Sequence, residues 1–333
     1  MSGKTVLQVV MLGCGAICEF HTAALRVNKD RFKLVGVADL NLEKARAVAE
    51  EFGAVSGGDG LKMISELRPD ITLIALPHLL HLEYGLAALE NGSHLFLEKP
   101  MAVNSDHCRQ LMKKAAECGK KIMVGHTHSF RPHFRRAARM IREGVIGKVE
   151  MIMDDAAVFY NFPQRPKWFL DPETAGGGAL FNLVPHMIDH LVYLHDSPLI
   201  EVSGKVSALY PGVEVDSECS AFFRYADGAA ALLTASIGNK LIDPGRIQCR
   251  VMGSKGSLLM NAFAPEIIRC YEDQREVIDC SADPLPVNLE WEEFYDHIVA
   301  GKSLHADGNY GAHIVKILEA LRNSSDRGRM VRL

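Results

Sequence analysis

The strongest constraint on the fold is a strand–turn–helix unit near the start of the chain, where Gly13-Cys-Gly15 interrupts an apolar run. Thr5–Leu12 is rich in Val and Leu, which is typical of a buried parallel strand, and an apolar-periodic helix follows to about Val27. Gly13 permits a tight turn, and Gly15 lets backbone N–H groups approach a pyrophosphate at the helix N-terminus. Taken alone, the two glycines fit an ordinary tight turn equally well.

Two further positions turn this unit into a dinucleotide-binding fingerprint. Cys18 occupies the third small position, where Gly or Ala is usual, and Asp39 follows 21 residues later at the end of a second strand. A carboxylate there binds the hydroxyls of the adenosine ribose. We expect NAD rather than NADP, because Asp39 would repel a 2′-phosphate and Leu40-Asn41 offers no cation. Lys44 and Arg46 are a weaker alternative cation site.

The segments that follow predict a two-domain α/β chain. Strand-like runs at Phe32–Ala38, Ile71–Leu76, His94–Leu97 and Lys121–Val124 alternate with helical patterns, as in a parallel Rossmann sheet. After residue 125 the pattern changes to a helix (Pro132–Glu143), a strand (Val149–Phe159), a helix (Leu183–His195), strands over Glu201–Cys280 and two closing helices (Leu289–Ala300, Tyr310–Leu321). We predict a dinucleotide-binding domain over 1–125. For 126–333 we predict an α+β domain for substrate binding and oligomerisation, with a large, mainly antiparallel open sheet.

Composition narrows the function classes. The 333 residues suit two domains, and a net charge of −4 without a long basic run disfavours a nucleic-acid partner. No apolar run approaches the roughly 18 residues needed to cross a bilayer. The start of the chain leaves no room for a signal peptide, and the eight cysteines form no CxxC pair. We therefore expect a cytoplasmic protein with reduced thiols and no membrane partner.

Several motifs resemble the glucose–fructose oxidoreductase/inositol dehydrogenase (Gfo/Idh/MocA) family. They are Gly13–His21, Leu76–His81, Glu98-Lys-Pro100 with the strand before it, Gly176–Asp189, and the stretch from Glu293 to Arg329. The resemblance covers nearly the whole chain in the expected order. It is specific for the family and not for the substrate.

The resemblance implies that Lys99 lies beside the nicotinamide and touches the reacting hydroxyl. A cation there can stabilise developing alkoxide charge; the alternative is a solvated lysine at a strand end. The cofactor contacts implied by the same motifs are Gly13, Gly15, Ala16, Ile17, Asp39, Pro77, His78, His81, Glu98 and Lys99.

The second signature implies a catalytic pair, which here is Asn182 and His186. The family normally has Asp at the first position, and the spacing of four places both side chains on one face of a helix. His186 has the intrinsic pKa to accept a hydroxyl proton near neutral pH, or else it is a core histidine. Asn182 cannot take a proton. With Asn at this position, the signature resembles that of family members that act on cis-dihydrodiols or dihydroxyphthalate-like rings.

Further polar residues are candidate substrate contacts. His126, His128 and Arg131 follow the last Rossmann strand, in a segment that lines the substrate cleft in the family, although a structural role fits equally well. The pairs His126/His128 and His186/His190 have spacings that suit zinc, but no Cys or carboxylate completes an evident set, so we expect no metal. Trp168 offers a face to a ring substrate and Arg165 or Lys167 could hold an anion, or the loop packs on its own domain.

The sequence thus favours an NAD(P)-dependent dehydrogenase that acts on a CH–OH carbon of a small sugar, cyclitol or related polyol. One alternative is an aromatic diol dehydrogenase of the dihydrodiol or dihydroxyphthalate type. The other is a non-enzymatic NAD(P)-sensing regulator, which the presence of both Lys99 and His186 argues against. We expect a homodimer or homotetramer.

Overall fold

The computed structural model describes residues 5–210, 212–238, 246–281 and 285–333. The chain divides into two compact units. The first runs to Gly125 and also contains Val287–Val315, whereas the second comprises His126–Pro286 and Lys316–Leu333. The longer stretch of the first unit therefore ends at Gly125. None of the described helices has both the length and the hydropathy required to cross a bilayer.

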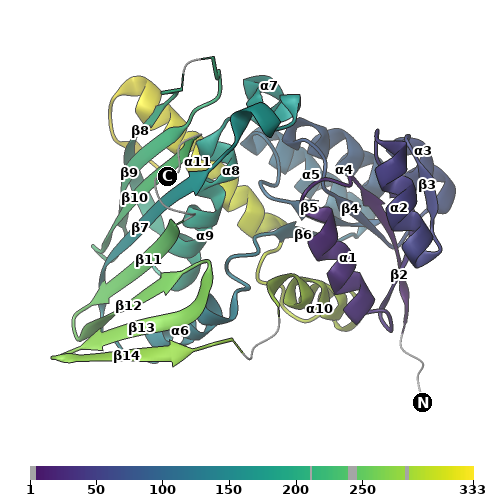
Figure 1. The fold of residues 1–333 in the computed structure, drawn as a ribbon. Coiled ribbons are helices and arrows are strands. Elements are labelled where there is room, and N and C mark those ends of the chain that lie inside the picture. Colours follow the sequence, from purple (N-terminus) through teal and green to yellow (C-terminus); the bar gives the residue numbers. More distant parts are fainter. Residues whose placement is uncertain (1–4, 211, 239–245, 282–284) are drawn as a thin grey trace. The chain divides into compact units, whose positions relative to one another are not determined.

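A parallel sheet organises the first unit, with the strand order β3-β2-β1-β4-β5-β6 (Figure 1). This is the doubly wound order, in which ligands bind beyond the carboxyl ends of the strands where the order reverses, here between β1 and β4. The strands are β1 (Leu7–Leu12), β2 (Phe32–Ala38), β3 (Val55–Gly57), β4 (Ile71–Ile74), β5 (His94–Glu98) and β6 (Ile122–Gly125). The helices are α1 (Cys18–Val27), α2 (Leu42–Phe52), α3 (Gly60–Leu67), α4 (His81–Glu90) and α5 (Ser105–Cys118), with a short 3₁₀ turn η1 (His78–Leu80).

Local chemistry explains where these helices begin and end. The side chains of Asn41 and Asn104 accept hydrogen bonds from backbone N–H groups three residues on, as N-caps do. Gly53 and Gly119 end the same two helices in the left-handed conformation. The expected strands and helices of this unit are present within a few residues. The sequence reading missed β3 and α3.

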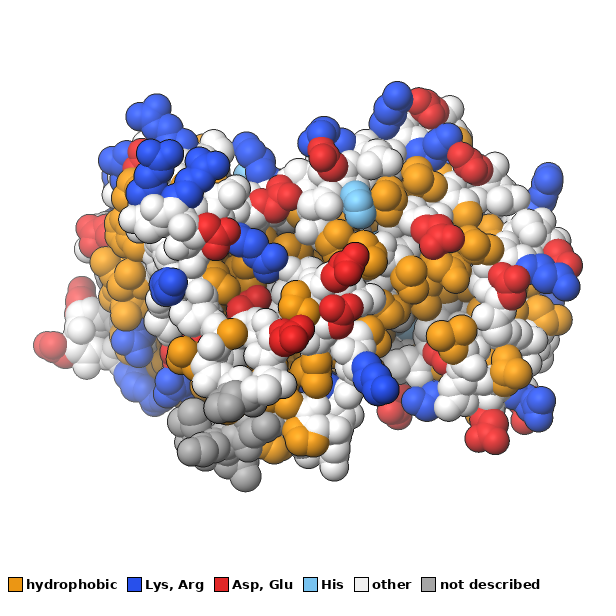
Figure 2. Space-filling model, turned by 90° about the horizontal axis from the view of Figure 1, so that it is seen from above, with side chains coloured by type: hydrophobic (Ala, Val, Ile, Leu, Met, Phe, Trp, Pro, Cys, Tyr) orange, Lys and Arg blue, Asp and Glu red, His pale blue; other side chains and the backbone are white. Residues whose placement is uncertain are grey.

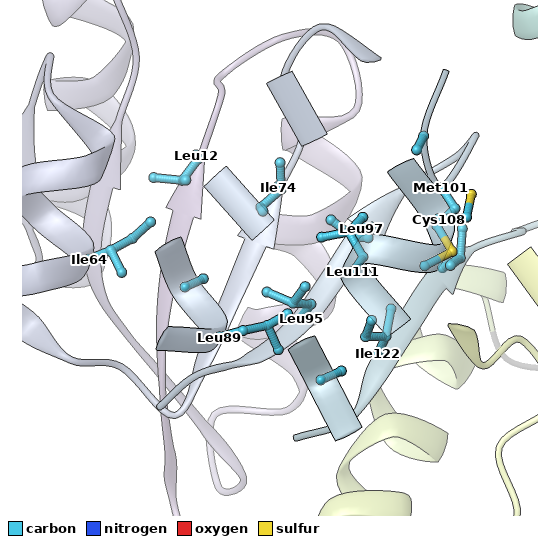
Figure 3. Packing of buried hydrophobic residues seen from close by; sticks show 14 of the residues in the cluster. Leu12, Ile64, Ile74, Leu89, Leu95, Leu97, Met101, Cys108, Leu111 and Ile122 are labelled. Carbon is cyan, nitrogen blue, oxygen red and sulfur yellow. The ribbon is translucent and has the colours of Figure 1, made fainter. Parts of the chain in front are cut away.

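One apolar cluster fills the space between the sheet and the helices on one of its faces (Figure 3). Leu12, Ile74, Leu95 and Leu97 contribute from β1, β4 and β5, and all are essentially inaccessible to solvent. Burial of each such side chain stabilises the fold by about 1.5–3 kcal/mol. This packing holds the carboxyl ends of the strands in a fixed arrangement.

A nine-stranded mixed sheet forms the second unit, in the order β14-β13-β12-β11-β7-β10-β9-β8-β15. Among the described strands of this sheet, only β7 and β10 pair in parallel, so the sheet is mainly antiparallel, as expected. Its strands are β7 (Val149–Phe159), β8 (Leu199–Ser207), β9 (Glu218–Tyr225), β10 (Ala230–Gly238), β11 (Arg246–Gly253), β12 (Gly256–Asn261), β13 (Ala264–Tyr271), β14 (Gln274–Asp279) and β15 (Val331–Arg332). A turn at Asp227-Gly228 joins β9 to β10.

Helices cover one face of this sheet and leave the other exposed. They are α6 (Pro132–Arg142), α8 (Ala179–Asn182), α9 (Val184–Leu194) and the end of α11 (Gly308–Arg327); short turns η2 (Phe162–Gln164), η3 (Lys167–Leu170) and α7 (Pro172–Ala175) lie in the loop after β7. In β9 alternate residues are buried and exposed, with Phe223 at 0% and Phe222 at 37%. That alternation is the mark of a sheet with one packed face.

The exposed surface carries both signs of charge. The face drawn in Figure 2 shows Lys and Arg side chains and Asp and Glu side chains, with hydrophobic side chains visible among them. This mixture agrees with the small net charge of −4.

The assignment of every residue after 125 to the second domain is wrong for the stretch 287–315. α10 (Pro286–Ala300) presents Trp291, Phe294 and Tyr295 on one helical face. The Trp291 ring lies 4.9 Å from Phe32 and 4.8 Å from Phe96, measured between ring centroids. The chain therefore returns to the first unit because an aromatic stripe completes the core around β2 and β5.

We predict that Trp291→Ala lowers the free energy of unfolding by about 3–5 kcal/mol, the usual cost of removing a fully buried large aromatic ring. Trp168, the other tryptophan of the chain, is only half-buried and serves as the matched control. Urea unfolding followed by far-ultraviolet circular dichroism measures both variants. Equal losses for Trp168→Ala and Trp291→Ala would contradict the packing of α10.

Candidate functional site

The two glycines in the first turn of the Rossmann unit have opposite surroundings. Gly13 is too crowded for any side chain, whereas the space around Gly15 is open. Gly13 has φ +97°, and a Cβ there would lie 2.3 Å from the carbonyl oxygen of Ala75. A Cβ on Gly15 would meet nothing within 4 Å. Gly13 therefore lets β1 pass close to the end of β4. The open space over Gly15 is where a phosphate would lie against the backbone N–H groups at the start of α1.

The Asp39 carboxylate fastens the same turn from the end of β2. It accepts hydrogen bonds from the backbone N–H of Cys14 at 2.6 Å and of Asn41 at 2.7 Å. Asp39 is half-buried, Ile17 is half-buried and Ala16 is exposed at the start of α1. The carboxylate thus shapes the turn in addition to presenting a negative charge at the position expected for a ribose contact.

A shallow hollow of about 360 Å³ lies beside this turn, between α1 and α2. Cys14, Gly15 and Cys18 line one side, and Arg26 and Lys44 lie on its rim. The Arg26 guanidinium is already paired with Glu51. Lys44 is therefore the cation of the alternative phosphate site that lies nearest the glycine turn.

A hydrogen-bonded chain holds the end of β5, where Glu98 and Lys99 lie. The indole N–H of Trp291 donates to His21 Nδ1 at 3.1 Å, so the neutral His21 ring carries its proton on Nε2. His21 Nε2 donates to Glu98 Oε1 at 2.8 Å, and Glu98 Oε2 accepts from the backbone N–H of Lys99 at 3.3 Å. Glu98 thereby orients the backbone that carries Lys99.

The charged ammonium group of Lys99 is shielded from water. Burial lowers the pKa of its ammonium group, and the neighbouring Glu98 carboxylate opposes that shift. A lowered pKa brings deprotonation closer to neutral pH, which suits a lysine that donates a hydrogen bond to an alcohol oxygen or exchanges its proton.

The loop after β4 places three more of the expected cofactor contacts, Pro77, His78 and His81. The His81 ring is completely buried, with Nε2 3.0 Å from the carbonyl oxygen of Leu76 and Nδ1 3.3 Å from that of Met101. Burial lowers its pKa. His81 therefore joins the loops that follow β4 and β5. His78 is buried beside it, with ring centroids 5.8 Å apart.

In the second unit, the glycine triplet is shaped by Asp216. A Cβ on Gly178 would lie 1.9 Å from the carbonyl oxygen of Asp216. The Asp216 carboxylate accepts from the N–H groups of Gly178 at 3.0 Å and Leu180 at 2.6 Å, which caps α8. The helix that carries Asn182 therefore starts at a fixed point.

Asn182 and His186 do not share one continuous helix, because α8 ends at Asn182 and α9 begins at Val184. Pro185 has no N–H to extend the hydrogen bonding of α8. The amide Nδ2 of Asn182 donates to the carbonyl oxygens of Gly178 at 3.1 Å and Gly177 at 3.4 Å. The amide N–H groups of Asn182 therefore point toward the glycine triplet. The His186 side chain is half-buried.

His186 belongs to a buried cluster of imidazole rings. It stacks on His128 with ring centroids 4.1 Å apart and an interplanar angle of 19°. His128 Nδ1 lies 3.0 Å from His190 Nε2, and His190 Nδ1 lies 2.6 Å from Asp154 Oδ2. The structure therefore connects His128, which the sequence proposed as a substrate contact, to a buried carboxylate.

Asp154, His190 and Cys249 are the described group whose possible ligand atoms lie within 4.8 Å of one another. Two ligands of one tetrahedral zinc ion lie about 3.3 Å apart, because each bond is about 2.0 Å long. The 2.6 Å between His190 and Asp154 is shorter and is the length of a charge-assisted hydrogen bond. We therefore treat this pair as hydrogen-bonded.

The remaining expected substrate contacts differ in burial and in the residues that they contact. His126 is fully buried after β6, and Arg131 is half-buried at the start of α6, where burial lowers its pKa. The Arg165 guanidinium lies over the Tyr160 ring, 4.2 Å from its centroid, and Trp168 contacts Phe169 edge-on at 5.3 Å. These last contacts favour packing within the loop.

Sequence reasoning missed His21, Trp291 and Asp154 as parts of these networks. Asp154 had a detectable signal, because it lies in register with the buried positions Ile152 and Ala156 of β7. An acid at an inward-facing position is unusual and needs a partner.

Comparisons with known proteins agree with the two-part fold. Residues 7–126 match the model of an oxidoreductase family with an NAD-binding Rossmann fold, and residues 134–259 match the Gfo/Idh/MocA C-terminal domain. D-glucoside 3-dehydrogenase of Escherichia coli is 24% identical over 98% of this chain and 97% of its own. Inositol 2-dehydrogenase of Rhizobium meliloti is 27% identical over 74% and 73%.

Two further matches add to this. 1-Carboxy-3-chloro-3,4-dihydroxycyclohexa-1,5-diene dehydrogenase of Comamonas testosteroni is 29% identical over 62% of this chain and 52% of its own. Levoglucosan dehydrogenase, solved with NADH and levoglucosan, has the same fold, with a TM-score of 0.91, 23% identity and 99% coverage of both chains.

The glycine turn generates a paired prediction. Gly13→Ala should destabilise the protein by more than the 1–3 kcal/mol or so of a strained backbone, because its Cβ also meets the Ala75 carbonyl. Gly15→Ala should leave stability unchanged but weaken NADH binding about tenfold or more, because its Cβ enters the space of the pyrophosphate.

Thermal unfolding and NADH fluorescence titration measure the two effects. Unchanged NADH affinity in Gly15→Ala would place the dinucleotide elsewhere.

Proposed function

The chain belongs to the Gfo/Idh/MocA family of NAD-binding oxidoreductases, and on that premise we propose that it oxidises a CH–OH group of a sugar, cyclitol or related polyol. The observation that carries the proposal is Lys99, held by the Trp291–His21–Glu98 chain at the carboxyl end of β5. Relatives named as glucoside and inositol dehydrogenases support this substrate class.

The residues of the chain fit the cofactor at the glycine turn. Gly13 and Gly15 open the space for a pyrophosphate, and the Asp39 carboxylate lies where the ribose hydroxyls are bound. When bound, the nicotinamide accepts the electron pair of the substrate C–H bond as hydride. Everything else in the reaction is binding, orientation and proton handling by the protein.

In our proposal Lys99 stabilises the reacting oxygen and His186 accepts its proton. As the C–H bond breaks and C=O forms, the hydroxyl oxygen loses its proton. The Lys99 ammonium donates a hydrogen bond to that oxygen and stabilises its developing negative charge. The neutral imidazole of His186 takes the proton.

A second candidate is an aromatic diol dehydrogenase. Asn182 replaces the family aspartate, and His128, one of the expected substrate contacts, stacks on His186. The Comamonas relative, whose name specifies a dihydroxycyclohexadiene carboxylate, supports this reading. A non-enzymatic NAD(P) regulator is the third, and steady turnover with any alcohol excludes it.

The decisive experiment is a panel of sugars, cyclitols and cis-diols incubated with NAD⁺ or NADP⁺ and followed at the NADH absorbance. We expect turnover with a polyol and a higher kcat/KM with NAD⁺, because the Asp39 carboxylate repels a 2′-phosphate. Turnover confined to cis-diols selects the second candidate. Preference for NADP⁺ would point to Lys44 and overturn the assignment of Asp39.

Lys99→Met should lower kcat by roughly 10²–10⁴, the span of a proton-transfer or charge-stabilising group. NADH affinity should stay within a few fold, because Lys99 acts on the reacting oxygen. Lys62→Met, on the exposed face of α3, is the control and should match the parent. Steady-state kinetics and NADH titration separate the two effects, and near-parental kcat in Lys99→Met removes this residue from the mechanism.

We further propose that the chain forms a homodimer or homotetramer through the exposed face of the nine-stranded sheet. Met153, Phe222 and Leu232 expose 37–40% of their surface there, beside a hollow of about 460 Å³. An apolar surface of this kind favours association. We propose a cytoplasmic location, because none of the eight cysteines forms a disulfide.

A further inference from the structure

The buried chain of Asp154, His190 and His128 has one consistent pattern of hydrogen bonds. A carboxylate only accepts, so His190 Nδ1 carries the proton that it donates to Asp154 Oδ2 at 2.6 Å. His190 Nε2 then holds a lone pair, and it accepts from Nδ1–H of His128 at 3.0 Å. Each imidazole is thus fixed in its Nδ1–H tautomer by the group behind it.

The outer end of this chain meets the proposed base. The His128 ring lies flat against His186, with centroids 4.1 Å apart. A positive charge on one of two stacked rings repels a positive charge on the other, so the protonation of His186 depends on the charge that His128 faces. Any negative charge that reaches His128 therefore acts on the proton affinity of the pair.

We propose that Asp154, His190 and His128 act as positioning residues for the oxidation, supplying to the His128–His186 pair the carboxylate that position 182 lacks. This inference rests on the proposed function, because it concerns the acceptor of the hydroxyl proton. That proton moves from the substrate oxygen to His186, while the C–H electron pair leaves as hydride. The resulting positive charge is stabilised by the Asp154 carboxylate through the two Nδ1–H hydrogen bonds.

The alternative source of a carboxylate is blocked locally. The Asn182 amide donates to the carbonyl oxygens of Gly178 and Gly177, and an aspartate there would present a carboxylate to the same two oxygens. β7 provides a carboxylate from the opposite side of the histidines instead. The hydrogen-bond partner of that carboxylate is His190, one residue beyond the Gly176–Asp189 motif.

The charged and titratable neighbours come from several elements, and all are buried or half-buried. Cys249 of β11 and Tyr225 of β9 lie near Asp154, and burial raises the pKa of both to well above its ordinary value. Both are therefore neutral near pH 7. Burial raises the pKa of Asp154 itself, and the hydrogen bond from His190 opposes that rise.

Other neighbours bear on the imidazoles. Burial lowers the pKa of His133 on α6 to about 4, so its ring is neutral at pH 7. The remaining groups are Asp155 beside Asp154, Arg131 before α6, and Asp189 on α9, which accepts from the N–H of Ser129. Among these groups, Asp154 is the anion that contacts the histidine chain directly.

The first test needs neither a substrate nor a variant. Nitrogen-15 NMR of histidine-labelled protein reports which ring nitrogen carries the proton. We expect the Nδ1–H tautomer for both His190 and His128 at neutral pH. An Nε2–H tautomer at either residue breaks the chain and overturns the proposal, while leaving the proposed oxidoreductase function untouched.

The second test removes the charge and keeps the shape. Asp154→Asn retains an oxygen that accepts from His190 Nδ1–H. Loss of the carboxylate should lower the apparent pKa of the His128–His186 pair by about one unit, the low end of the effect of a nearby opposite charge. Asp227→Asn is the matched control, because Asp227 pairs with His195 at 3.2 Å in the same unit but outside the chain.

With the substrate from the panel, kcat should rise with pH through this ionisation, because only the neutral pair accepts a proton. In Asp154→Asn the rising limb should move about one unit lower and the plateau kcat should fall about tenfold or more, with KM within a few fold. If Asp154 had a merely structural role, Asp154→Asn would lower stability and leave the rising limb at the parental pH. The control Asp227→Asn should also leave the limb at the parental pH.

An unshifted limb in folded Asp154→Asn overturns the proposal. So does stoichiometric zinc in the purified protein whose removal by a chelator changes the histidine spectra, because the cluster would then be a metal site. Absence of turnover in the parent enzyme with every compound counts against the proposed function, and the NMR titration of Asp154→Asn still decides the role of the chain.

Discussion

A carboxylate held against a buried imidazole is the interaction on which both units depend. Removing an acid from water costs several kcal/mol unless hydrogen bonds replace the lost hydration. His21 meets this requirement for Glu98, and His190 meets it for Asp154. Because each imidazole has a second nitrogen, each pair extends to a third group, Trp291 in the first unit and His128 in the second. The resulting chains fix tautomers as well as positions.

Close backbone contacts at glycine provide the other constraint. At Gly13 the carbonyl of Ala75 occupies the place of a side chain, and at Gly178 the carbonyl of Asp216 does so. In both cases a nearby aspartate then binds the freed N–H groups, Asp39 at the first turn and Asp216 at the second. A crowded glycine beside an aspartate that accepts backbone N–H groups thus fixes the glycine turn after β1 in the first unit and the start of α8 in the second.

Features encoded in short stretches could be predicted from the sequence. The apolar runs of the sequence placed β2 and β7 at their observed ends, because such signals arise within a few residues. The family motifs indicated Lys99 and His186. The return of α10 to the first unit was not predictable in this way, because its aromatic stripe packs on residues far away in sequence, and Trp291 also contacts His21, 270 residues away. The Asp154 chain likewise joins β7, α9 and the segment after β6, and no local pattern connects them.

Asn182 illustrates why a departure from a family pattern has to be interpreted with its surroundings. Position 182 faces two carbonyl oxygens of the glycine triplet, which an amide N–H satisfies and a carboxylate cannot. An aspartate there would have an elevated pKa, since repulsion from the carbonyl dipoles disfavours its charged form. Such a residue would be a poor anionic partner for His186. In our proposal the asparagine can coexist with a proton-accepting histidine because a carboxylate reaches the imidazoles from β7, where Asp154 accepts a hydrogen bond from His190.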